Sequence, residues 1–458
     1  MQVSELAAEA RTLPPVRKHL SLRALAKTTR NQLAGMPREV FRDKLVHTQA
    51  LGRHRYYVMD PDLIQEVLVR RSGIMRRTGE MRRSLVPLLG EGLLTAEEGD
   101  WRWQRRALAP GFQHNRLQAM LPTMIAAAER TRDRWLASAG SRLRMTHEMM
   151  HTTFDIIVET MLSGEAAVDV ARFERSIFDY ARPLGWVLVL ALTGAPSWMP
   201  FPGRRRQRDA VRYLRATAAG ILAERRRASS QRDDLVALLL SAVDTQDGRT
   251  MTDEEIVDNL LTFVIAGHET TSLGLTWTLH LLTRHPEVMA KLVAEIDAVT
   301  GGAALRAEHV AQLTYTRAVF SEAMRLYPPA PMISRQVAEE FELGGYRIEA
   351  GSNLVVPIFA VHRHKLLWDE PKRFDPERFG AEAAAARSRY AYMPFGAGPR
   401  VCIGNSFAML EGVAVLGVLL GRLRLRDVSA VLPTPVMKVT LRPWPDLEMI
   451  AEDRAKGA

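Results

Sequence analysis

The only cysteine in this chain of 458 residues is Cys402, which lies in the glycine-rich stretch YMPFGAGPRVCIGN, residues 392–405. It cannot form an intramolecular disulfide, so its thiol is free for other chemistry. Gly396, Gly398 and Gly404 permit unusual backbone dihedrals and let a flat ligand approach the main chain. An apolar run at helical spacing follows, which places the sulfur just before a helix N-terminus, where the dipole favours thiolate. Such a thiolate can ligate the iron of a porphyrin, although an isolated cysteine is more often a small buried apolar side chain.

A second group of reactive residues is the stretch Ala266-Gly267-His268-Glu269-Thr270. Glycine in the middle of a helix costs about 1 kcal/mol relative to alanine, so Gly267 needs a reason, such as close approach of a ligand. Thr270 lies four residues after Ala266, and its hydroxyl can bond to that carbonyl. A hydroxyl beside the carboxylate of Glu269 can also carry protons to a reacting oxygen atom. His268 points to another side of the helix, so we expect it to be solvated or packed.

Residues 395–404, FGAGPRVCIG, resemble the haem-binding signature of the cytochromes P450. That signature fixes five residues, and the chain has all of them in register: Phe395, Gly398, Arg400, Cys402 and Gly404. The resemblance implies that this loop, Gly396 included, binds haem b and that Cys402 is the axial ligand of its iron. It also implies that Thr270 hydrogen-bonds dioxygen, that Glu269 helps to relay protons, and that Ala266 and Gly267 lie against the cofactor.

The resemblance covers residues 46–450 approximately. It implies a mainly α fold with a smaller β-rich side, in one haem domain over residues 1–458 that starts with an extension to about residue 35 and has no fused reductase. The implied reaction inserts one oxygen atom of O2 into a lipophilic organic substrate, by hydroxylation or epoxidation. The electrons would come from a separate ferredoxin or flavodoxin and its NAD(P)H-dependent reductase.

Four further residues resemble the family's ligands for the haem propionates: Trp101, Arg105, Arg335 and Arg400. Arginine suits this task because its guanidinium is planar, bidentate and always charged.

Glu322 and Arg325, at i and i+3, match the family's Glu-x-x-Arg motif, and Arg378 in FDPERF matches the arginine that joins them. The resemblance implies a buried network that fixes the Cys402 loop without taking part in the chemistry. His362-Arg363 also follows a family pattern, but His364 stands where aspartate is common, and their role stays open.

The spacing of apolar residues predicts the elements that would position these groups. Residues 251–286 predict a buried helix that begins with a capping box of Thr252 and Glu255. Several helices are expected between residues 115 and 240, an irregular loop over 73–92, and strands at 54–59, 333–357 and 434–450. The resemblance implies that residues 184–202 cover the substrate entrance, and a plain helical hairpin is the alternative. If exposed there, Trp186 and Trp198 would suit a membrane surface.

The formal net charge is +10, yet the basic residues alternate with acidic ones and no nucleic-acid-binding motif is present. The N-terminus shows no signal peptide or membrane anchor, which predicts a cytoplasmic protein. Arg102, Arg106 and Arg400, expected near the Cys402 side, would suit an acidic electron donor.

Three other functions remain open. One is a haem-thiolate enzyme that uses or isomerises peroxides without a redox partner, and another is a haem-binding sensor without catalytic activity. The last is a basic nucleic-acid-binding helical protein, for which the chain has no motif. The Glu269–Thr270 pair favours the monooxygenase, because neither haem-binding alternative needs it.

Overall fold

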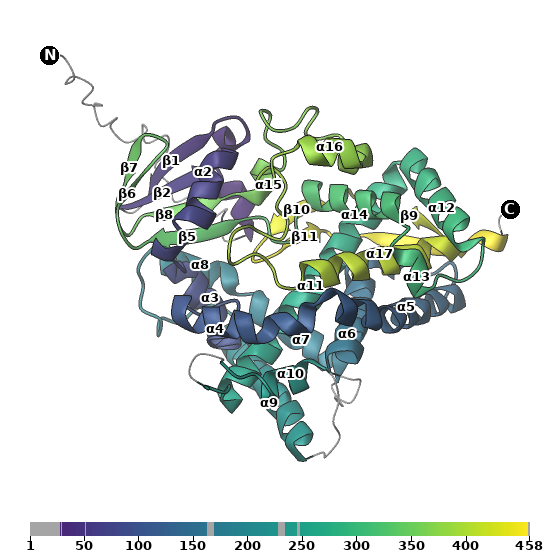
Figure 1. Cartoon of the computed structure of the whole chain (residues 1–458), viewed down its shortest axis with the longest axis horizontal. Helices are drawn as coiled ribbons and strands as arrows, with labels where there is room; N and C mark the ends of the chain where they lie inside the picture. The colour runs from purple at the N-terminus through teal and green to yellow at the C-terminus, as the bar shows by residue number, and fades with distance from the viewer. Residues whose placement is uncertain are drawn as a thin grey trace.

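The computed structural model describes residues 28, 30–50, 52–162, 169–227, 234–244 and 248–456. Most of the molecule is helical, and the strands of the largest sheet lie at one side, while the strands near the C-terminus lie towards the centre and the other side (Figure 1). This confirms the predicted mainly α fold with a smaller β-rich part. The N-terminal extension lies, up to residue 27, outside the described residues. The helices of ten residues or more are α3 (Gly79–Leu89), α4 (Glu98–Leu108), α5 (His114–Ala137), α6 (Met145–Met161), α7 (Val170–Ala181), α9 (Arg204–Arg227), α11 (Asp253–Arg284), α12 (Pro286–Thr300), α14 (Thr314–Leu326) and α17 (Asn405–Arg422). The shorter ones are α2 (Pro61–Gln65), α8 (Leu184–Leu192), α10 (Leu235–Leu240), α13 (Ala307–Val310), α15 (Ile358–Val361) and α16 (Ala381–Ala386).

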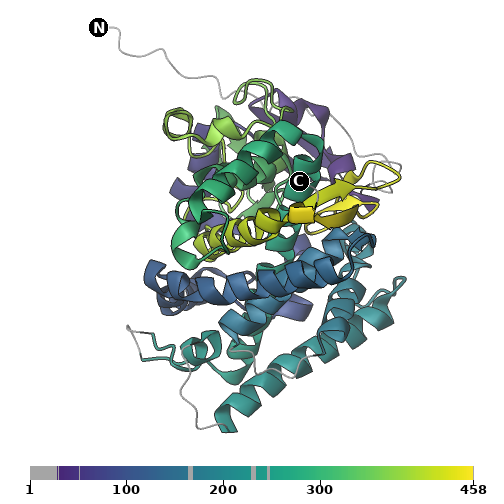
Figure 2. The same ribbon diagram turned by 90° about the vertical axis from the view of Figure 1, so that its right-hand side faces the viewer.

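Helix α11 is the central helix, as the sequence predicted. Thr252 caps it, and the side chain of Glu255 reaches back to the Thr252 amide, so the capping box forms. It packs against α6, α9, α14 and α17. Figure 2 shows α5 and α17 running side by side, with α9 on the outside of the molecule. Because neighbours surround α11, almost its whole circumference has to be apolar or internally bonded.

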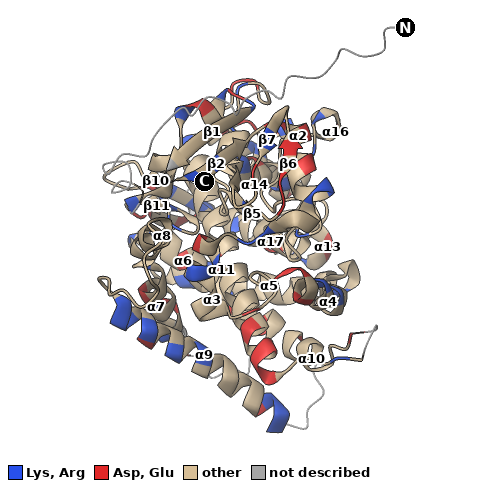
Figure 3. Cartoon of the chain, turned by 90° about the vertical axis from the view of Figure 1, so that its left-hand side faces the viewer, with Lys and Arg blue, Asp and Glu red and all other residues tan. Residues whose placement is uncertain are grey.

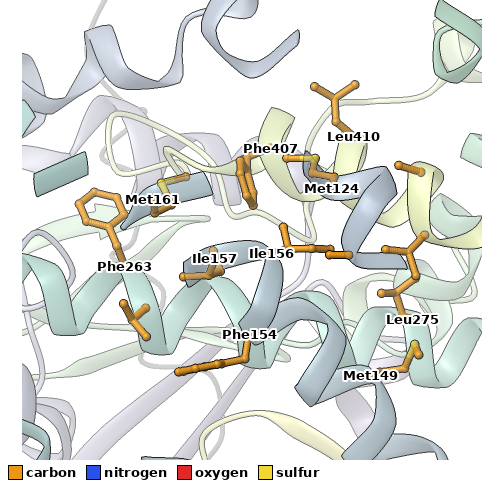
Figure 4. Close-up of a cluster of buried hydrophobic side chains, with 14 of the residues drawn as sticks. Met124, Met149, Phe154, Ile156, Ile157, Met161, Phe263, Leu275, Phe407 and Leu410 are labelled. Carbon is orange, nitrogen blue, oxygen red and sulfur yellow. The ribbon is translucent and has the colours of Figure 1, made fainter. Parts of the chain in front are cut away.

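The core between these helices is a cluster of large apolar side chains (Figure 4). Helix α6 contributes Phe154 and Ile157, α11 contributes Phe263 and Leu275, and α17 contributes Phe407. Among the described residues, α17 is the one helix long and apolar enough to cross a membrane, and 67% of it is buried in the protein. Its composition is explained by this burial in the core.

The largest sheet has five strands in the order β1-β2-β8-β5-β3. They are β1 (Leu45–Ala50), β2 (Arg53–Val58), β8 (Asn353–Val356), β5 (Ile333–Val337) and β3 (Met75–Arg76). Strands β2 and β8 pair in parallel and the other neighbours pair antiparallel. The smaller sheets are β4 (Leu143–Arg144) with β12 (Glu448–Asp453) and β9 (Leu423–Asp427), β6 (Phe341–Leu343) with β7 (Tyr346–Ile348), and β10 (Thr434–Met437) with β11 (Leu441–Trp444).

The predicted irregular loop over residues 73–92 is wrong, because most of it is helix α3. The hydroxyl of Thr78 caps the helix by accepting a hydrogen bond from the Met81 amide. Pro87 lies inside the helix, and glycines stand at both of its ends. Proline and glycine are typical of loops, so the sequence predicted a loop here although a capping residue and apolar positions are present. Packing against α8, α9 and α11 stabilises the helix.

Candidate functional site

The loop that carries Cys402 is held in a tight conformation by backbone hydrogen bonds. The Cys402 amide donates to the Phe395 carbonyl at 2.9 Å. Gly396 and Gly398 both have φ of +76°, a region that favours glycine. A Cβ on Gly398 would also lie 2.0 Å from the Leu68 carbonyl oxygen. Gly396 and Gly398 are therefore required by the fold of the loop itself, whereas Gly404 has an ordinary φ of −88° and room for a Cβ.

The thiol of Cys402 is accessible at its surface, although protein surrounds it, because it faces an internal space in front of α17. Burial raises the pKa of the Cys402 thiol, while the Gly404 amide and Arg105 act in the opposite direction. The amide at the start of α17 favours the thiolate, as expected, but in the protein alone burial is the larger effect. A bound metal cation would shift the thiol to thiolate.

One face of α11 is open. Between residues 256 and 282 every residue is buried except four: Ile265, Ala266, Gly267 and Thr270. Ala266 is exposed, although it lies in the middle of a helix that neighbours otherwise cover. The Thr270 hydroxyl donates to the Ala266 carbonyl at 2.7 Å, as predicted. Since its single proton is engaged, the Thr270 oxygen is left as an acceptor on the open face.

The small size of Gly267 has a packing reason. A Cβ there would lie 2.7 Å from Cδ1 of Ile157 on α6, so a larger residue would displace the end of that side chain, and glycine lets the two helices pack without this shift. His268 is buried beside the edge of the Phe154 ring, with ring centroids 5.6 Å apart, and its Nδ1 lies 2.6 Å from the Val264 carbonyl. Of the two roles expected for His268, packing is confirmed and solvation is wrong. Burial lowers its pKa, so it is neutral.

Glu269 is buried and forms an ion pair with Arg442 on β11, at 2.7 Å. Its Oε1 also accepts a hydrogen bond from the Thr440 hydroxyl. Burial opposes the charge, but Arg442 and Thr440 outweigh it and lower the pKa of Glu269. The carboxylate next to Thr270 in sequence is thus charged and already bound, a state that spacing along one helix could not reveal.

Three arginines lie near one another at the edge of the internal space. Arg400 lies over the Trp101 ring, 4.5 Å from its centroid, and donates to the Ala96 carbonyl at 2.9 Å. Burial and Arg400 lower the pKa of Arg335 to about 10. Burial, Arg335 and Arg400 together lower the pKa of Arg77, which follows β3, to about 8.

Arg77 is 8% exposed, and its Nε is buried without a hydrogen-bond partner. Like charges do not gather in a partly buried place unless an anion balances them. The sequence analysis missed Arg77, because it stands in no motif and is brought near Arg335 by the pairing of β3 with β5. The fourth cation, Arg105, donates to the Val401 carbonyl at 2.9 Å, so it supports the loop as well.

The buried network has formed around Glu322 and Arg325, both 0% exposed. Arg325 donates to both carboxylate oxygens of Glu322, at 2.6 and 2.7 Å. Arg378 lies 3.7 Å from Glu322, and its Nε has no hydrogen-bond partner. The network is therefore unequal, with a tight pair and a third member at longer range.

His362, whose role the sequence left open, joins this network to the Cys402 loop. Its Nε2 accepts from the Met393 amide at 2.9 Å, and its Nδ1 lies 3.2 Å from the Arg325 carbonyl. Burial, Arg325 and Arg363 lower its pKa to about 3, so the ring is neutral and can act as donor and acceptor at once. His364 lies elsewhere, with its Nε2 3.1 Å from the Asp43 carbonyl.

The residues present fit a flat, iron-bearing group with acidic substituents, such as the haem that the sequence predicted. A thiol is accessible within the protein, one helix leaves an open face, and three arginines lie near one another, of which Arg77 and Arg335 form no ion pair among the described residues. Among the residues that the structure describes, no three His, Cys, Asp or Glu side chains gather as a metal site. A metal at Cys402 would therefore bring its other ligands with it.

The surface features expected from the sequence are partly corrected. Arg400 faces the interior and pairs with Glu98, so it is not a surface cation. Arg102 and Arg106 are exposed but pair with Glu98 and Asp244. Trp186 and Trp198 are exposed, 47% and 69%, on α8 and the segment after it. The Trp198 carbonyl accepts a hydrogen bond from Arg204 at the start of α9, a helix that carries many basic residues (Figure 3).

Known proteins resemble this chain over most of its length. The model of the family described as Cytochrome P450 matches residues 20–446. The chain is 33% identical to cyclooctatin synthase of Streptomyces melanosporofaciens, over 90% of this chain and 89% of that protein. It is 32% identical to pentalenene oxygenase of Streptomyces avermitilis, over 81% of each. A crystal structure of a cytochrome P450DA heme domain superposes with a TM-score of 0.81 at 27% identity, covering 90% of both chains.

Proposed function

The chain belongs to the cytochrome P450 family, and from that premise we propose that Cys402, the open face of α11 and the arginine cluster form its haem site. Members of the family bind haem b and act as monooxygenases that need O2, an organic substrate and a redox partner, and this chain is one of them. The observation that carries the proposal is the accessible Cys402 thiol inside the protein. When bound, haem b supplies the redox chemistry that transfers one oxygen atom of O2 to the substrate.

Cys402 would be the axial iron ligand, with Phe395, Gly396 and Gly404 shaping its loop and Ala266 and Gly267 on the opposite side. Arg77, Arg335, Arg400 and Trp101 would bind the propionates, since a pair of carboxylates would balance the charge of the three partly buried guanidiniums. Arg105 would support the loop through the Val401 carbonyl.

Proton delivery would use the Thr270 oxygen as a fixed acceptor. Because Thr270 donates to Ala266, its lone pairs can orient a water molecule or a protonated oxygen species on the open face. Glu269 would take part only when its contact with Arg442 opens, since the bound carboxylate is charged and has no proton to give. We therefore propose that Arg442 controls the proton relay by holding Glu269.

The substrate we propose is lipophilic and uncharged. The name of pentalenene oxygenase gives an alkene as the substrate of that relative. In this chain Ile265 and Ala266 stand on the open face, and α8 near the expected entrance is almost wholly apolar. An uncharged substrate avoids the cost of burying an unpaired charge among these side chains.

We propose a cytoplasmic single-domain enzyme that receives electrons from a separate ferredoxin or flavodoxin. Arg102 and Arg106 remain on the surface, about half exposed, where an acidic donor could compete for them with Glu98 and Asp244. Turnover with an acidic ferredoxin should therefore fall as salt rises. A rate that does not change with salt would contradict this way of docking.

The test of the haem site is the absorbance of the ferrous–CO complex. Cys402 as thiolate ligand predicts a red-shifted Soret band in the purified protein, and Cys402→Ser should retain the fold and lose that shift. An unshifted band in the natural protein would refute the proposal. Thr270→Ala should keep the band and divert reducing equivalents to hydrogen peroxide, with Thr270→Ser as the matched control. Full coupling in Thr270→Ala would refute the proton-relay role of Thr270.

A further inference from the structure

A second cleft opens away from Cys402, where the end of α11, the start of α12, the end of α14 and residues 372–377 meet. Its volume is about 730 Å³, which is ample for a small organic molecule. None of the residues assigned above to the haem site lines it. Its walls include the aromatic residues Tyr315, Tyr327, Phe359 and Phe374. In Figure 1, α12 and α14 lie on the side of the molecule opposite the five-stranded sheet.

Arg363 and Lys372 are the two cations of this cleft for which the described residues give no ion pair, and of the two Arg363 is the one that lies over aromatic rings. Its guanidinium lies 3.8 Å from the centroid of the Phe359 ring and 5.3 Å from that of Tyr327. Its hydrogen bond goes to the Phe359 carbonyl in its own turn and is long, at 3.4 Å. Burial lowers the pKa of Arg363 to about 9. The side chain is thus held flat against aromatic rings with most of its donors unused.

Two other cations of the cleft are neutralised. Lys291 pairs with Glu377 at 2.5 Å, and Arg373 pairs with Glu370 at 3.0 Å. These pairs stand at the exposed rim, whereas Arg363 is shielded by the rings. An arginine that lines a cavity and lies over aromatic rings can receive a planar anion in two parallel hydrogen bonds.

We propose that this cleft binds a small organic carboxylate with an apolar body, the carboxylate on Arg363 and the body against the aromatic walls. The site is separate from the haem pocket and does not depend on the proposed substrate. A carboxylate matches the guanidinium and needs no further charge in the cleft, and the rings supply the contact area for the rest of the ligand.

A ligand in this cleft would also affect the Cys402 loop, because the cleft shares residues 372–377 with the buried network that supports the loop. Residues 372–377, which line the cleft, also hold the buried network, because the Asp375 amide donates to Glu322 at 2.9 Å and the Arg373 carbonyl accepts from Arg325 at 2.9 Å. A ligand in the cleft contacts this segment from the other side. Because it binds the folded protein only, it stabilises the segment and the haem-bound enzyme with it.

The experiment is calorimetric titration of the haem-loaded enzyme with 4-phenylbutanoate and, separately, with 4-phenylbutanamide. The amide keeps the body and removes the charge, so it should bind about tenfold more weakly. Arg363→Gln should weaken the acid by about tenfold, and Arg363→Lys should be intermediate because it keeps the charge without the planar fork. Arg373→Gln, a rim arginine that is already paired, is the matched control and should stay within about twofold.

Equal binding of acid and amide would overturn the proposal, and this comparison requires no variant, so it decides the matter even where Arg363→Gln does not fold. Binding that Arg363→Gln and Arg363→Lys leave unchanged would overturn it as well. The ligand would lie in the haem pocket if the titration shifted the haem Soret band by the same amount in the natural protein and in both Arg363 variants. That result would also refute the second site. Failure of the ferrous–CO test, in contrast, would leave the acid-versus-amide comparison intact.

Discussion

Replacement of Arg325 by lysine tests whether the tight pair with Glu322 dominates the buried network. Arg325 uses all five of its N–H donors: two on Glu322, and one each on the carbonyls of His362, Pro371 and Arg373, at 2.6–2.9 Å. Lysine keeps the charge but has three donors, so at least two buried acceptors lose their hydrogen bond.

Each buried acceptor left without a donor costs about 1–3 kcal/mol, so Arg325→Lys should lower the free energy of unfolding by about 2–6 kcal/mol. That is a large part of the total stability of a typical domain, about 5–15 kcal/mol. Arg378→Lys is the matched control, because Arg378 stands 3.7 Å from Glu322 and its Nε has no partner. It should cost about 1 kcal/mol or less.

The assay is urea unfolding of both haem-loaded variants, followed by the ferrous–CO band to report the fraction with thiolate ligation. We expect Arg325→Lys to lose both stability and the red-shifted band, and Arg378→Lys to retain both. Equal losses in the two variants, or a loss below about 1 kcal/mol for Arg325→Lys, would refute the argument that the five hydrogen bonds of Arg325 hold the loop.

Three other outcomes follow from the contacts. Arg442→Gln removes the cation that lowers the pKa of Glu269. A carboxyl whose pKa is lower in the folded than in the unfolded protein stabilises the fold at pH values above its unfolded pKa, and this stabilisation disappears on acidification. In urea unfolding the variant should therefore lose about 2 kcal/mol at pH 7.5 and progressively less towards pH 4. Arg77→Gln should release haem to apomyoglobin about tenfold faster, because one charge-assisted hydrogen bond is lost, while Arg77→Lys should be intermediate. Trp186→Ala with Trp198→Ala should reduce cosedimentation with anionic vesicles, since both rings are exposed and the basic start of α9 follows Trp198 closely in the chain; equal binding of variant and natural protein would contradict this.

The chemistry that one stretch of chain contains could be predicted from the sequence. The hydrogen bond from Thr270 to Ala266 and the pair of Glu322 with Arg325 depend on helical spacing alone, and both are present. The position of Cys402 before a helix depends on a local run of apolar residues, and α17 begins three residues later. Such features are fixed by backbone geometry over one or two turns, so no tertiary information is needed.

Interactions between distant segments could not be predicted in this way. Arg442 is 173 residues from Glu269, and only the meeting of β11 with α11 brings the two together. Gly267 illustrates a second limit, because a glycine required by a ligand and one required by a neighbouring helix look the same in sequence. Its contact with Ile157 shows the second reason, and the first was inferred from the motif.

The Cys402 loop is held at both ends by groups that do not touch the sulfur. At its start the Met393 amide donates to Nε2 of His362, and at its end Arg105 donates to the Val401 carbonyl. Since Nε2 accepts, the proton of the neutral His362 ring must lie on Nδ1, where it can be donated to the Arg325 carbonyl. The pKa of about 3 keeps this arrangement unchanged through neutral and mildly acidic pH. The sulfur is therefore positioned by a neutral bridge on one side and a cation on the other, so the geometry of the thiolate does not vary with pH even though its own charge depends on the bound metal.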